Sequence, residues 1–306
     1  MKVLIDGDII RYRVGFACQH TYYDWWHQDD IEKDEELGGG MVVKASAKEP
    51  VAECIDAKAA KEWIEAAENP ELYVRIPRVE VEPLGNALSA CNLVMDSIIK
   101  RYQPCDVVVY FSCPTEDNWR TAFYPEYKAT RPSRKPHWHA EVQDHMAKKW
   151  GCILAPSLEA DDLIAMAAAT CADEEEDACV VTIDKDMDQI PGLHYNWVKD
   201  EEYFMTEAEA EFCLQVQCLA GDRTDNIKGI PGMGEVKATK WLQEESKVNG
   251  YVRVWDAYKA YYDDPYEADY QVALNRALVT LPVDDAHRVD LITEIEDARR
   301  EMQKAA

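Results

Sequence analysis

The sequence predicts an α/β fold: a central, mostly parallel sheet flanked by helices, followed by a helical lobe. Its short apolar runs are continuous rather than alternating, which is typical of strands covered on both faces. Stretches with helical spacing lie between these runs, and strands that alternate with helices favour a parallel sheet. After about Tyr203, helical spacing dominates to the end of the chain. We therefore expect an α/β domain over residues 1–203 and a helical lobe over residues 204–306.

Four apolar runs are the expected strands, in chain order Val3–Ile5, Val107–Phe111, Cys152–Leu154 and Cys179–Ile183. Two longer stretches between them are the expected helices. Leu84–Tyr102 carries its apolar residues on one helical stripe, and Leu158–Cys171 follows a proline–serine start signal.

Residues 18–80 fit this alternation poorly, and we interpret them as an insertion. They hold a cluster of tyrosines and tryptophans over 22–26, an acidic stretch Asp29–Glu36 and the glycines Gly38–Gly40. We expect a hairpin here and a short helix around Ala57–Ala67.

Composition excludes some classes of protein. The 306 residues are 47% hydrophobic and 30% charged, as in globular proteins, and the formal net charge is −26. A surface this acidic repels phosphate backbones at long range, which excludes a cationic nucleic-acid coat protein but not an enzyme with a local positive field. Asp6 and Asp8 stand where a signal peptide needs apolar residues. We expect a cytoplasmic protein, in the host cytoplasm if it is encoded by a phage, with no membrane association.

Carboxylates follow two of the expected strands. Asp6 comes after the first strand, and Asp184 and Asp186 come after the fourth. In open parallel sheets the functional crevice lies at the carboxyl ends of the strands, so these acids should face each other. Their mutual repulsion calls for a cation, and hard oxygen ligands select Mg²⁺ or Mn²⁺ over zinc.

Two further acidic clusters lie outside the strand ends. Glu159, Asp161 and Asp162 stand at the start of an expected helix, and Asp222 and Asp225 precede a glycine-rich turn. Acids in a first helical turn also stabilise the helix dipole, and in a chain with 59 acidic residues a single cluster is usually solvated surface. Four clusters beside buried strands, a helix start and a turn together predict a metal site.

Positive charge and aromatic rings alternate over residues 115–150. The basic residues are Arg120, Lys128, Arg131, Arg134, Lys135, Lys148 and Lys149, and the aromatic ones include Trp119, Phe123, Tyr124, Tyr127 and Trp138. Basic groups beside stacking platforms fit nucleic-acid binding, although an aromatic-rich surface loop would show the same pattern.

Five motifs in order resemble the 5′–3′ exonuclease and flap endonuclease superfamily, which has a PIN-like nuclease domain. They are Leu4–Asp8, Tyr124–Arg131, Leu158–Asp162, Thr182–Asp188 and Ala220–Gly234. The resemblance is greatest to bacteriophage 5′–3′ exonucleases and to the N-terminal nuclease domain of bacterial DNA polymerase I. It implies a two-metal enzyme that hydrolyses DNA at or near 5′ ends, as an exonuclease or a flap endonuclease, in phage DNA replication or degradation.

The resemblance also assigns residues. Two Mg²⁺ or Mn²⁺ ions would be held by Asp6, Glu159, Asp161, Asp162, Asp184, Asp186, Asp222 and Asp225. Lys128 and Arg131 would be catalytic, with Lys128 on the scissile phosphate. The last motif resembles a helix–turn–helix variant, and a K⁺ ion held by its carbonyl oxygens is a further implication. DNA would be bound through Tyr127, Arg134, Lys135, Lys228, Gly229, Gly232, Gly234 and Lys237, with RNA–DNA hybrids as a further substrate.

The pattern departs from the family at one point and leaves two alternatives open. Many relatives carry another aspartate after the second strand, where this chain has Phe111–Pro114 and Asp117 is the nearest acid. A haloacid-dehalogenase-type phosphatase would use Asp6 as a nucleophile and Asp8 as an acid. A DNA-end-binding protein with a weakened site is the non-enzymatic alternative.

Overall fold

The computed structural model describes residues 1–34, 40–103, 105–131, 134–244 and 250–305, and it divides into two compact units. Unit 1 comprises Met1–Arg11, Cys91–Arg134 and Gln143–Ala306, and unit 2 comprises Tyr12–Ala90 and Lys135–Val142. The acidic clusters all belong to unit 1, so one compact body contains every carboxylate of the predicted site.

Unit 1 is built on a five-stranded sheet with the order β10-β9-β8-β1-β7. The strands are β1 (Lys2–Asp6), β7 (Asp106–Tyr110), β8 (Ala178–Val181), β9 (Gly192–Asn196) and β10 (Glu201–Met205). β1 pairs in parallel with β7 and β8, β8 pairs in parallel with β9, and only β10 runs antiparallel. The predicted fold class, an α/β protein with a mostly parallel sheet, is confirmed.

One expected strand is wrong. Cys152–Leu154 forms no strand, because Ile153 makes only an isolated parallel bridge to Tyr110, the last residue of β7. Ile153 and Leu154 are 43% and 53% exposed, so this apolar run is not covered on both faces. The sequence also did not reveal β9 and β10, whose polar residues break the continuous apolar pattern.

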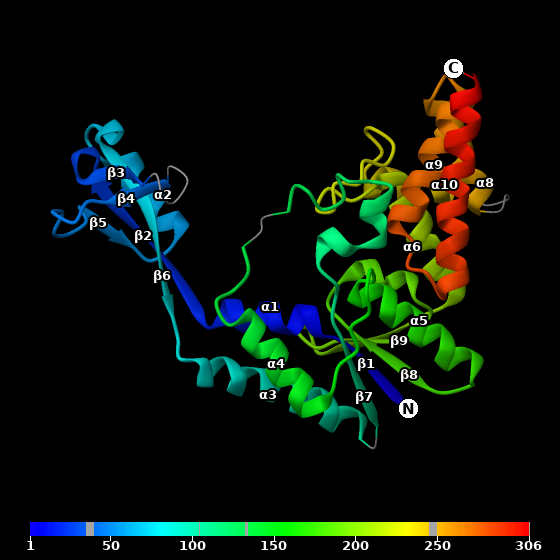
Figure 1. Cartoon of the computed structure of the whole chain (residues 1–306), viewed down its shortest axis with the longest axis horizontal. Helices are drawn as coiled ribbons and strands as arrows, with labels where there is room; N and C mark the ends of the chain where they lie inside the picture. The colour runs from blue at the N-terminus through cyan, green and yellow to red at the C-terminus, as the bar shows by residue number, and fades with distance from the viewer. Residues whose placement is uncertain (35–39, 104, 132–133, 245–249, 306) are drawn as a thin grey trace. The chain divides into compact units, whose positions relative to one another are not determined.

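Helices pack around this sheet and continue to the end of the chain. Those that lie wholly in unit 1 are α5 (Ala160–Asp173), α6 (Glu207–Ala220), α7 (Glu235–Glu244), α8 (Gly250–Tyr261), α9 (Pro265–Val279) and α10 (Asp285–Ala305). α9 and α10 lie side by side (Figure 1). A shared core joins the sheet to α5, α9 and α10 through Leu4, Ile164, Ala277 and Leu291. This core fixes the start of α5 beside the ends of the strands.

Local signals explain where these helices begin. Thr206 and Glu209 form a reciprocal capping box at the start of α6, and Asp264 caps α9 ahead of Pro265. The expected helix over Leu84–Tyr102 is confirmed as α3 (Leu84–Tyr102). Three helices, α1 (Gly7–Ala17), α3 and α4 (His139–Trp150), have residues in both units.

Unit 2 contains the expected insertion. Its sheet has the order β5-β2-β6, with β2 (Gln19–His27), β5 (Ala52–Cys54) and β6 (Tyr73–Val81), beside a hairpin of β3 (Ile31–Asp34) and β4 (Gly40–Val43). The expected short helix is α2 (Ala57–Ala66), which is capped by Asp56. Trp25 and Trp63 stack with ring centroids 5.5 Å apart over the buried Cys54 and Ala60. The hairpin and the helix are confirmed, whereas Gly38 and Gly39 lie outside the described residues.

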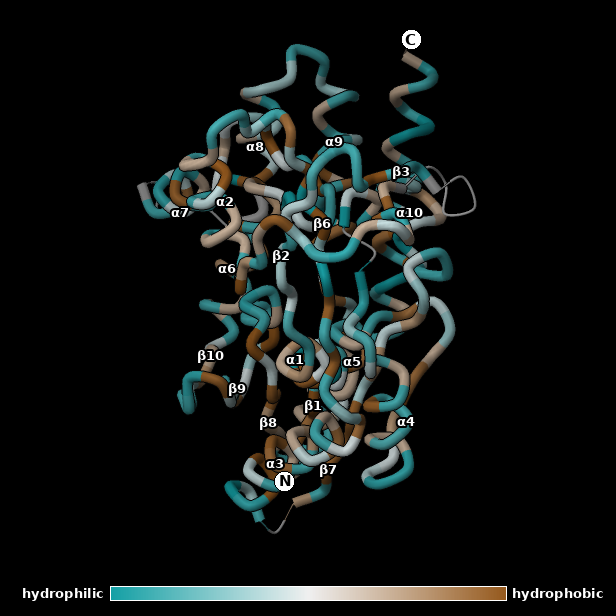
Figure 2. Tube along the Cα trace, turned by 90° about the vertical axis from the view of Figure 1, so that its left-hand side faces the viewer, coloured by the Kyte–Doolittle hydropathy of each residue, from teal (hydrophilic) through white to brown (hydrophobic). Residues whose placement is uncertain are grey.

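Hydropathy follows this architecture. Figure 2 shows hydrophobic, brown tube in strands β1 and β8 and largely hydrophilic tube toward the C-terminus of α10. None of the helices in the described part of the chain has the length and apolar character needed to cross a membrane.

Candidate active site

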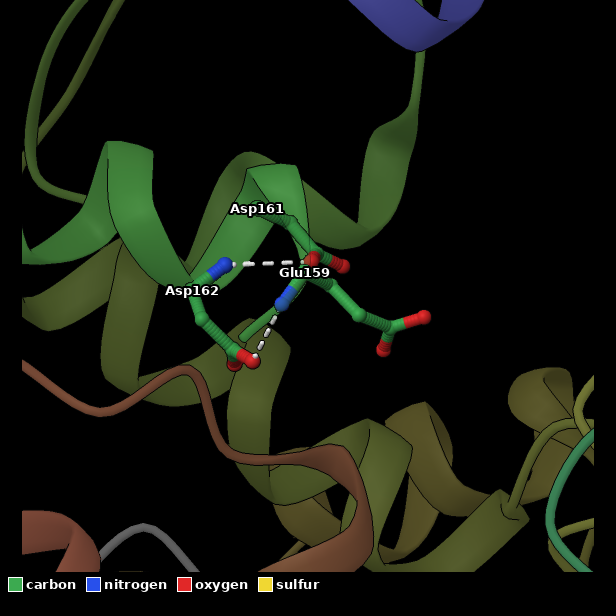
Figure 3. A group of neighbouring side chains, drawn as sticks. All are labelled: Glu159, Asp161 and Asp162. Carbon is green, nitrogen blue, oxygen red and sulfur yellow. Dashed lines mark hydrogen bonds between the residues drawn. The ribbon is translucent and has the colours of Figure 1, made fainter. Parts of the chain in front are cut away.

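The start of α5 presents three carboxylates. Glu159 is the residue before the helix, and its capping box with Asp162 fixes the first turn. Ligand oxygens of Glu159, Asp161 and Asp162 lie within 4.8 Å of one another. Figure 3 shows the carboxylate of Asp162 turned back to the backbone N–H of Glu159, whereas the Glu159 carboxylate extends away from it. The same turn therefore aims its acids in different directions.

Glu159 is held by groups from the segment between β7 and α4. The Tyr127 hydroxyl donates to Glu159 Oε2 at 2.7 Å, and the Lys128 ammonium pairs with Oε1. Burial alone would raise the pKa of Glu159, but Lys128 and Arg120 lower it to about 2. Asp161 has the opposite balance, because burial and the charges of Glu159 and Asp162 raise its pKa well above the ordinary value.

Asp6 ends β1 at the carboxyl edge of the sheet. Its Oδ1 accepts the backbone N–H of Asp8 at 3.1 Å, and its Oδ2 accepts the Thr182 hydroxyl at 3.2 Å. The same Thr182 oxygen accepts the backbone N–H of Asp184 at 3.1 Å, which joins the ends of β1 and β8. Burial, followed by the charges of Asp8 and Asp184, raises the pKa of Asp6 to about 7.

The turn after β8 carries the second strand-end group. Asp184 caps the short 3₁₀ helix Lys185–Gln189 by accepting the backbone N–H of Asp186 at 3.0 Å. Gln217 of α6 donates to Asp186 Oδ1 at 2.8 Å. Burial raises the pKa of Asp186 to about 7, with Asp184 and Asp222 adding to the shift. These carboxylates carry more negative charge than the neighbouring protein cations offset, which is the environment that a divalent cation requires.

A close backbone approach holds the glycine-rich turn against the end of α6. Gly221 and Gly229 have positive φ values of 67° and 56°. A Cβ on Gly229 would stand 2.4 Å from the carbonyl carbon of Ala220, and one on Gly221 would stand 2.4 Å from the Ile227 oxygen. Only glycine fits at both positions, and the contact holds Asp222 in its bridge to Ile227.

The loop that carries Asp225 is joined to the lysine–arginine motif, that is, to Lys128 and Arg131. Lys128 N–H donates to the Asp225 carbonyl at 2.9 Å, and the Asn226 amide donates to the Glu126 carbonyl at 2.9 Å. Lys128 adopts a left-handed backbone conformation with φ 57°. Arg131 pairs with the Asp225 carboxylate, and Lys128 Nζ lies 3.5 Å from it. Backbone strain of this kind is found at functional sites, and here it fixes the position of the Lys128 side chain beside the carboxylates.

A cavity of about 610 Å³ lies between these segments. The predicted site residues in its wall are Tyr127, Arg131, Asp161, Asp184, Asp186, Asp222, Asp225 and Gly234. Asp6, Lys128 and Glu159 are connected to the same group through Thr182, Tyr127 and Asp225. The structure thus brings together acids from the ends of two strands, one helix start and one loop.

The predicted DNA-binding residues have diverse environments. Tyr127 is buried inside the site, whereas Lys228, Gly232, Gly234 and Lys237 are exposed around the glycine-rich turn. Lys237 donates to the Gly232 carbonyl at 2.9 Å, and Gly229 is buried. Arg134 is exposed at the end of one segment of unit 1, and Lys135 belongs to unit 2.

Three members of the basic and aromatic segment are buried: Tyr127, as described above, and the neighbours Trp119 and Arg120. Trp119 and Arg120 are 6% and 1% exposed, so the expectation that they face nucleic acid is wrong. Arg120 instead pairs with Asp162 and, at 3.5 Å, with Glu159. The adjacent tryptophan and arginine are the signal in the sequence for this burial, because the indole N–H and the guanidinium can both donate hydrogen bonds to a buried carboxylate.

Three acids near the site motifs, Asp8, Asp117 and Asp188, are not among the predicted metal ligands. Asp8 pairs with Arg11 at 2.6 Å and accepts the backbone N–H of Ser112 at 3.1 Å, so it reaches the segment where the additional aspartate of the relatives is missing. Asp188 accepts the Tyr203 hydroxyl at 2.6 Å, and Asp117 is exposed. Sequence reasoning missed Thr182 and Gln217, whose only signal is their place next to an acidic motif.

Comparison with known proteins agrees with this geometry. Residues 79–215 match the family model of the 5′–3′ exonuclease, N-terminal resolvase-like domain. This part of the chain is therefore similar to a 5′–3′ exonuclease domain. DNA polymerase I of Mycobacterium bovis is 29% identical over 215 residues, which cover 64% of this chain and 24% of the polymerase. Flap endonuclease Xni of Shewanella baltica is 29% identical over 187 residues, which cover 56% of this chain and 69% of that protein.

A solved structure shares the fold of the exonuclease domain. T5 5′-exonuclease with bound zinc ions is 18% identical, with a TM-score of 0.51, and the match covers 71% of this chain and 89% of that one. The chain spans about a quarter of the length of the polymerase I relatives. The likeness to the solved structure therefore agrees with the observed α/β fold.

Proposed function

We propose that this protein is a metal-dependent 5′ nuclease that hydrolyses DNA phosphodiester bonds at or near 5′ ends. It would act as an exonuclease, a flap endonuclease or both, on DNA with 5′ ends or flaps, in the replication or degradation of phage DNA in the host cytoplasm. RNA–DNA hybrids are a further substrate in this proposal. The α/β part over 1–203 would cut, and the helical lobe over 204–306 would hold the duplex.

One observation carries this proposal. Carboxylates from the turn after β8, the start of α5 and the loop before the glycine-rich turn line one cavity, and Lys128 and Arg131 pair with carboxylates of this group. Asp6 at the end of β1 is joined to the same group through Thr182. A solvated surface cluster does not require the fold to bring carboxylates together from four distant parts of the chain. Such a group fits oxygen-preferring divalent cations beside an anionic substrate.

The carboxylates would hold two Mg²⁺ or Mn²⁺ ions. Asp6, Glu159, Asp161 and Asp162 form the group at the start of α5, and Asp184, Asp186, Asp222 and Asp225 form the other; the part that Asp162 takes in its group is considered below. When bound, two such ions supply an activated water and stabilise the charge on the leaving oxygen. The protein itself orients these acids through Thr182, Tyr127 and Gln217.

Lys128 and Arg131 would act on the scissile phosphate. Both cations stand at the carboxylate site on a loop whose backbone is hydrogen-bonded to the Asp225 carbonyl and to the Asn226 side-chain amide. A positioned cation stabilises charge that develops in the transition state and costs no reorganisation at that moment.

The DNA itself would be held mainly outside the carboxylate group. Exposed Lys228 and Lys237, with the backbone of Gly229, Gly232 and Gly234, would contact duplex phosphates, and a K⁺ ion at the turn would add to this contact. Arg134 and Lys135 would bind the DNA strand near its 5′ end. Tyr127 would contact the same strand from within the site.

The test uses the full chain with 5′-labelled blunt, recessed and flapped duplexes and an RNA–DNA hybrid in Mg²⁺, with products sized over time. We expect short 5′-phosphorylated products that disappear when EDTA removes the metal. Asp200→Asn is the matched control, because Asp200 pairs with Arg101 on the surface and its left-handed backbone suits asparagine.

Two results would overturn the proposal. Release of inorganic phosphate without chain cleavage would favour the phosphatase alternative, in which Asp6 is a nucleophile. Tight binding of a 5′ end with intact DNA in both Mg²⁺ and Mn²⁺ would favour a DNA-end-binding protein.

A further inference from the structure

Arg120 forms a buried clamp between the start of α5 and the end of α9. Its Nη1 and Nη2 donate to the two oxygens of Asp162 at 3.0 and 2.8 Å. Its Nε donates to the Leu278 carbonyl at 2.9 Å, and Nη2 also donates to the Thr280 carbonyl at 2.8 Å. The last carbonyls of a helix lack partners within the helix, and a cation suits that end of the dipole. The guanidinium therefore joins a fixed acid to a fixed helix end.

The Asp162 carboxylate accepts four hydrogen bonds from protein donors, three on Oδ2 and one on Oδ1. Besides the two bonds from Arg120, its Oδ2 accepts the Trp119 indole N–H at 3.2 Å and the backbone N–H of Glu159 at 3.1 Å. The residue is 0% exposed. An ionised carboxylate has about four acceptor sites, and four donors already occupy this one. A metal ion at Asp162 would have to displace a bidentate arginine from a buried position.

We propose that Arg120 and Asp162 are a positioning pair that sets the directions of Glu159 and Asp161, and that Asp162 is not a metal ligand. This inference rests on the proposed function, since it concerns how that site is held. Asp162 anchors the backbone of Glu159 directly, and Asp161 Oδ1 accepts the Asp162 N–H at 3.0 Å. The two remaining acids of α5 are therefore oriented through Asp162.

The pair should behave as one unit. Removing one partner leaves the other charge buried without compensation, whereas replacing both removes that penalty. Asp162→Asn should therefore lower the thermal midpoint, and Arg120→Gln in the same chain should recover part of the loss. A double-mutant cycle on these two positions measures the coupling.

The decisive experiment counts the Mn²⁺ ions bound at saturation by folded wild type, Asp161→Asn and Asp162→Asn, in the absence of DNA. We expect Asp161→Asn to bind one ion fewer than wild type and Asp162→Asn to bind as many ions as wild type. Single-turnover cleavage by Asp162→Asn should fall at least about tenfold at saturating metal, as for other partners that orient ligands. The double variant Asp162→Asn with Arg120→Gln should recover at least a third of that loss on a logarithmic scale.

Two results overturn the inference: loss of one bound ion in Asp162→Asn, or wild-type cleavage by that variant. If Asp162→Asn does not fold, the double variant is tested for ion count in its place. Trp119→Phe then supplies a milder change, since it removes one hydrogen bond and no charge; its ion count should equal wild type and its rate should fall. The ion count needs no substrate. A wild type that cuts no DNA would therefore refute the proposed function, whereas the ion counts would still test whether Asp162 is a metal ligand.

Discussion

The two acidic groups of the site offset their charge in different ways. At the start of α5, Glu159 is paired with Lys128, and Asp162 is paired with Arg120. At the strand ends, Asp186 has an amide donor from Gln217 and only a weak opposing effect from Lys185. Accordingly, the pKa of Glu159 is lowered to about 2, whereas that of Asp186 is raised to about 7.

Because of this difference, the α5 group should be preorganised by the protein, whereas the strand-end group should depend on bound metal. Protein cations already hold most of the α5 group in place, so its geometry should persist without metal. The strand-end group gathers carboxylates that repel one another, so an added cation should stabilise it most. Substitutions in the two groups should therefore differ in their effects on cleavage, on stability and on pH dependence.

The largest effect should come from the strand-end group. Asp184→Asn with Asp186→Asn should reduce the single-turnover rate by roughly 10³-fold or more, about 4 kcal/mol, because charge stabilisation at one metal position is lost. Binding to a 5′-ended duplex should remain, since that depends mainly on the turn and the basic residues. Gel-shift and cleavage assays in Mg²⁺ measure both, with Asp200→Asn as the control. Cleavage within about tenfold of wild type would remove this group from the mechanism.

The next effect concerns Lys128, the cation on the α5 side. Lys128→Ala should reduce the single-turnover rate by roughly 10²-fold, about 2.7 kcal/mol, with duplex affinity changed far less. Lys228→Ala is the matched comparison, because that side chain is 73% exposed and far less engaged by carboxylates. It should weaken binding with the cleavage rate at saturation unchanged. Equal rates for wild type and Lys128→Ala would exclude Lys128 from catalysis.

A smaller effect should appear in stability as a function of pH. The raised pKa of Asp186 means that, in EDTA, the folded state binds more protons than the unfolded state between about pH 4 and 7. The contribution of Asp186 to stability should thus be complete below that range and should fall as the pH rises toward 7. Asp186→Asn should flatten this fall and raise the metal-free midpoint by a few degrees at pH 8.

Thermal melts from pH 5 to 8 test this, with Asp188→Asn as a control on the same turn, since Asp188 is bonded to the Tyr203 hydroxyl. Mg²⁺ should raise the midpoint of wild type more than that of Asp186→Asn. A wild-type midpoint that rises steadily toward pH 8 in EDTA would contradict the sign.

The smallest effect is the dependence of DNA binding on salt. Contacts limited to the turn and the basic residues neutralise few phosphates, so the log–log slope should be on the order of −2 to −5. Lys228→Ala should reduce its magnitude by about 1. Binding titrations between 50 and 200 mM salt measure the slope; a value near −10 would require a far larger phosphate footprint.

Sequence patterns were sufficient for features whose signal is local. Continuous apolar runs located β1, β7 and β8, and acids next to them located the strand-end group, because parallel strands deliver their carboxyl ends to one edge. Helical spacing similarly gave α3 with its observed bounds.

Features that depend on distant partners were not predictable. Arg120 looked like a surface cation because its acceptors, Leu278 and Thr280, lie 158 and 160 residues further along the chain. In unit 2, β2 pairs with β6 across the intervening hairpin and helix, and neither strand has a continuous apolar run. Local residue types could show that charge and aromatic rings were present, but not which of them the fold would bury.

The two acidic groups of the site should hold separate metal ions. Equilibrium dialysis of the folded, DNA-free protein against saturating Mn²⁺ counts bound ions in wild type, in Asp161→Asn and in the variant with Asp184→Asn and Asp186→Asn. We expect two ions for wild type and one for each variant, because each change removes ligands from one group only. A wild type that binds a single ion, or a variant of either group that still binds two, would contradict the claim.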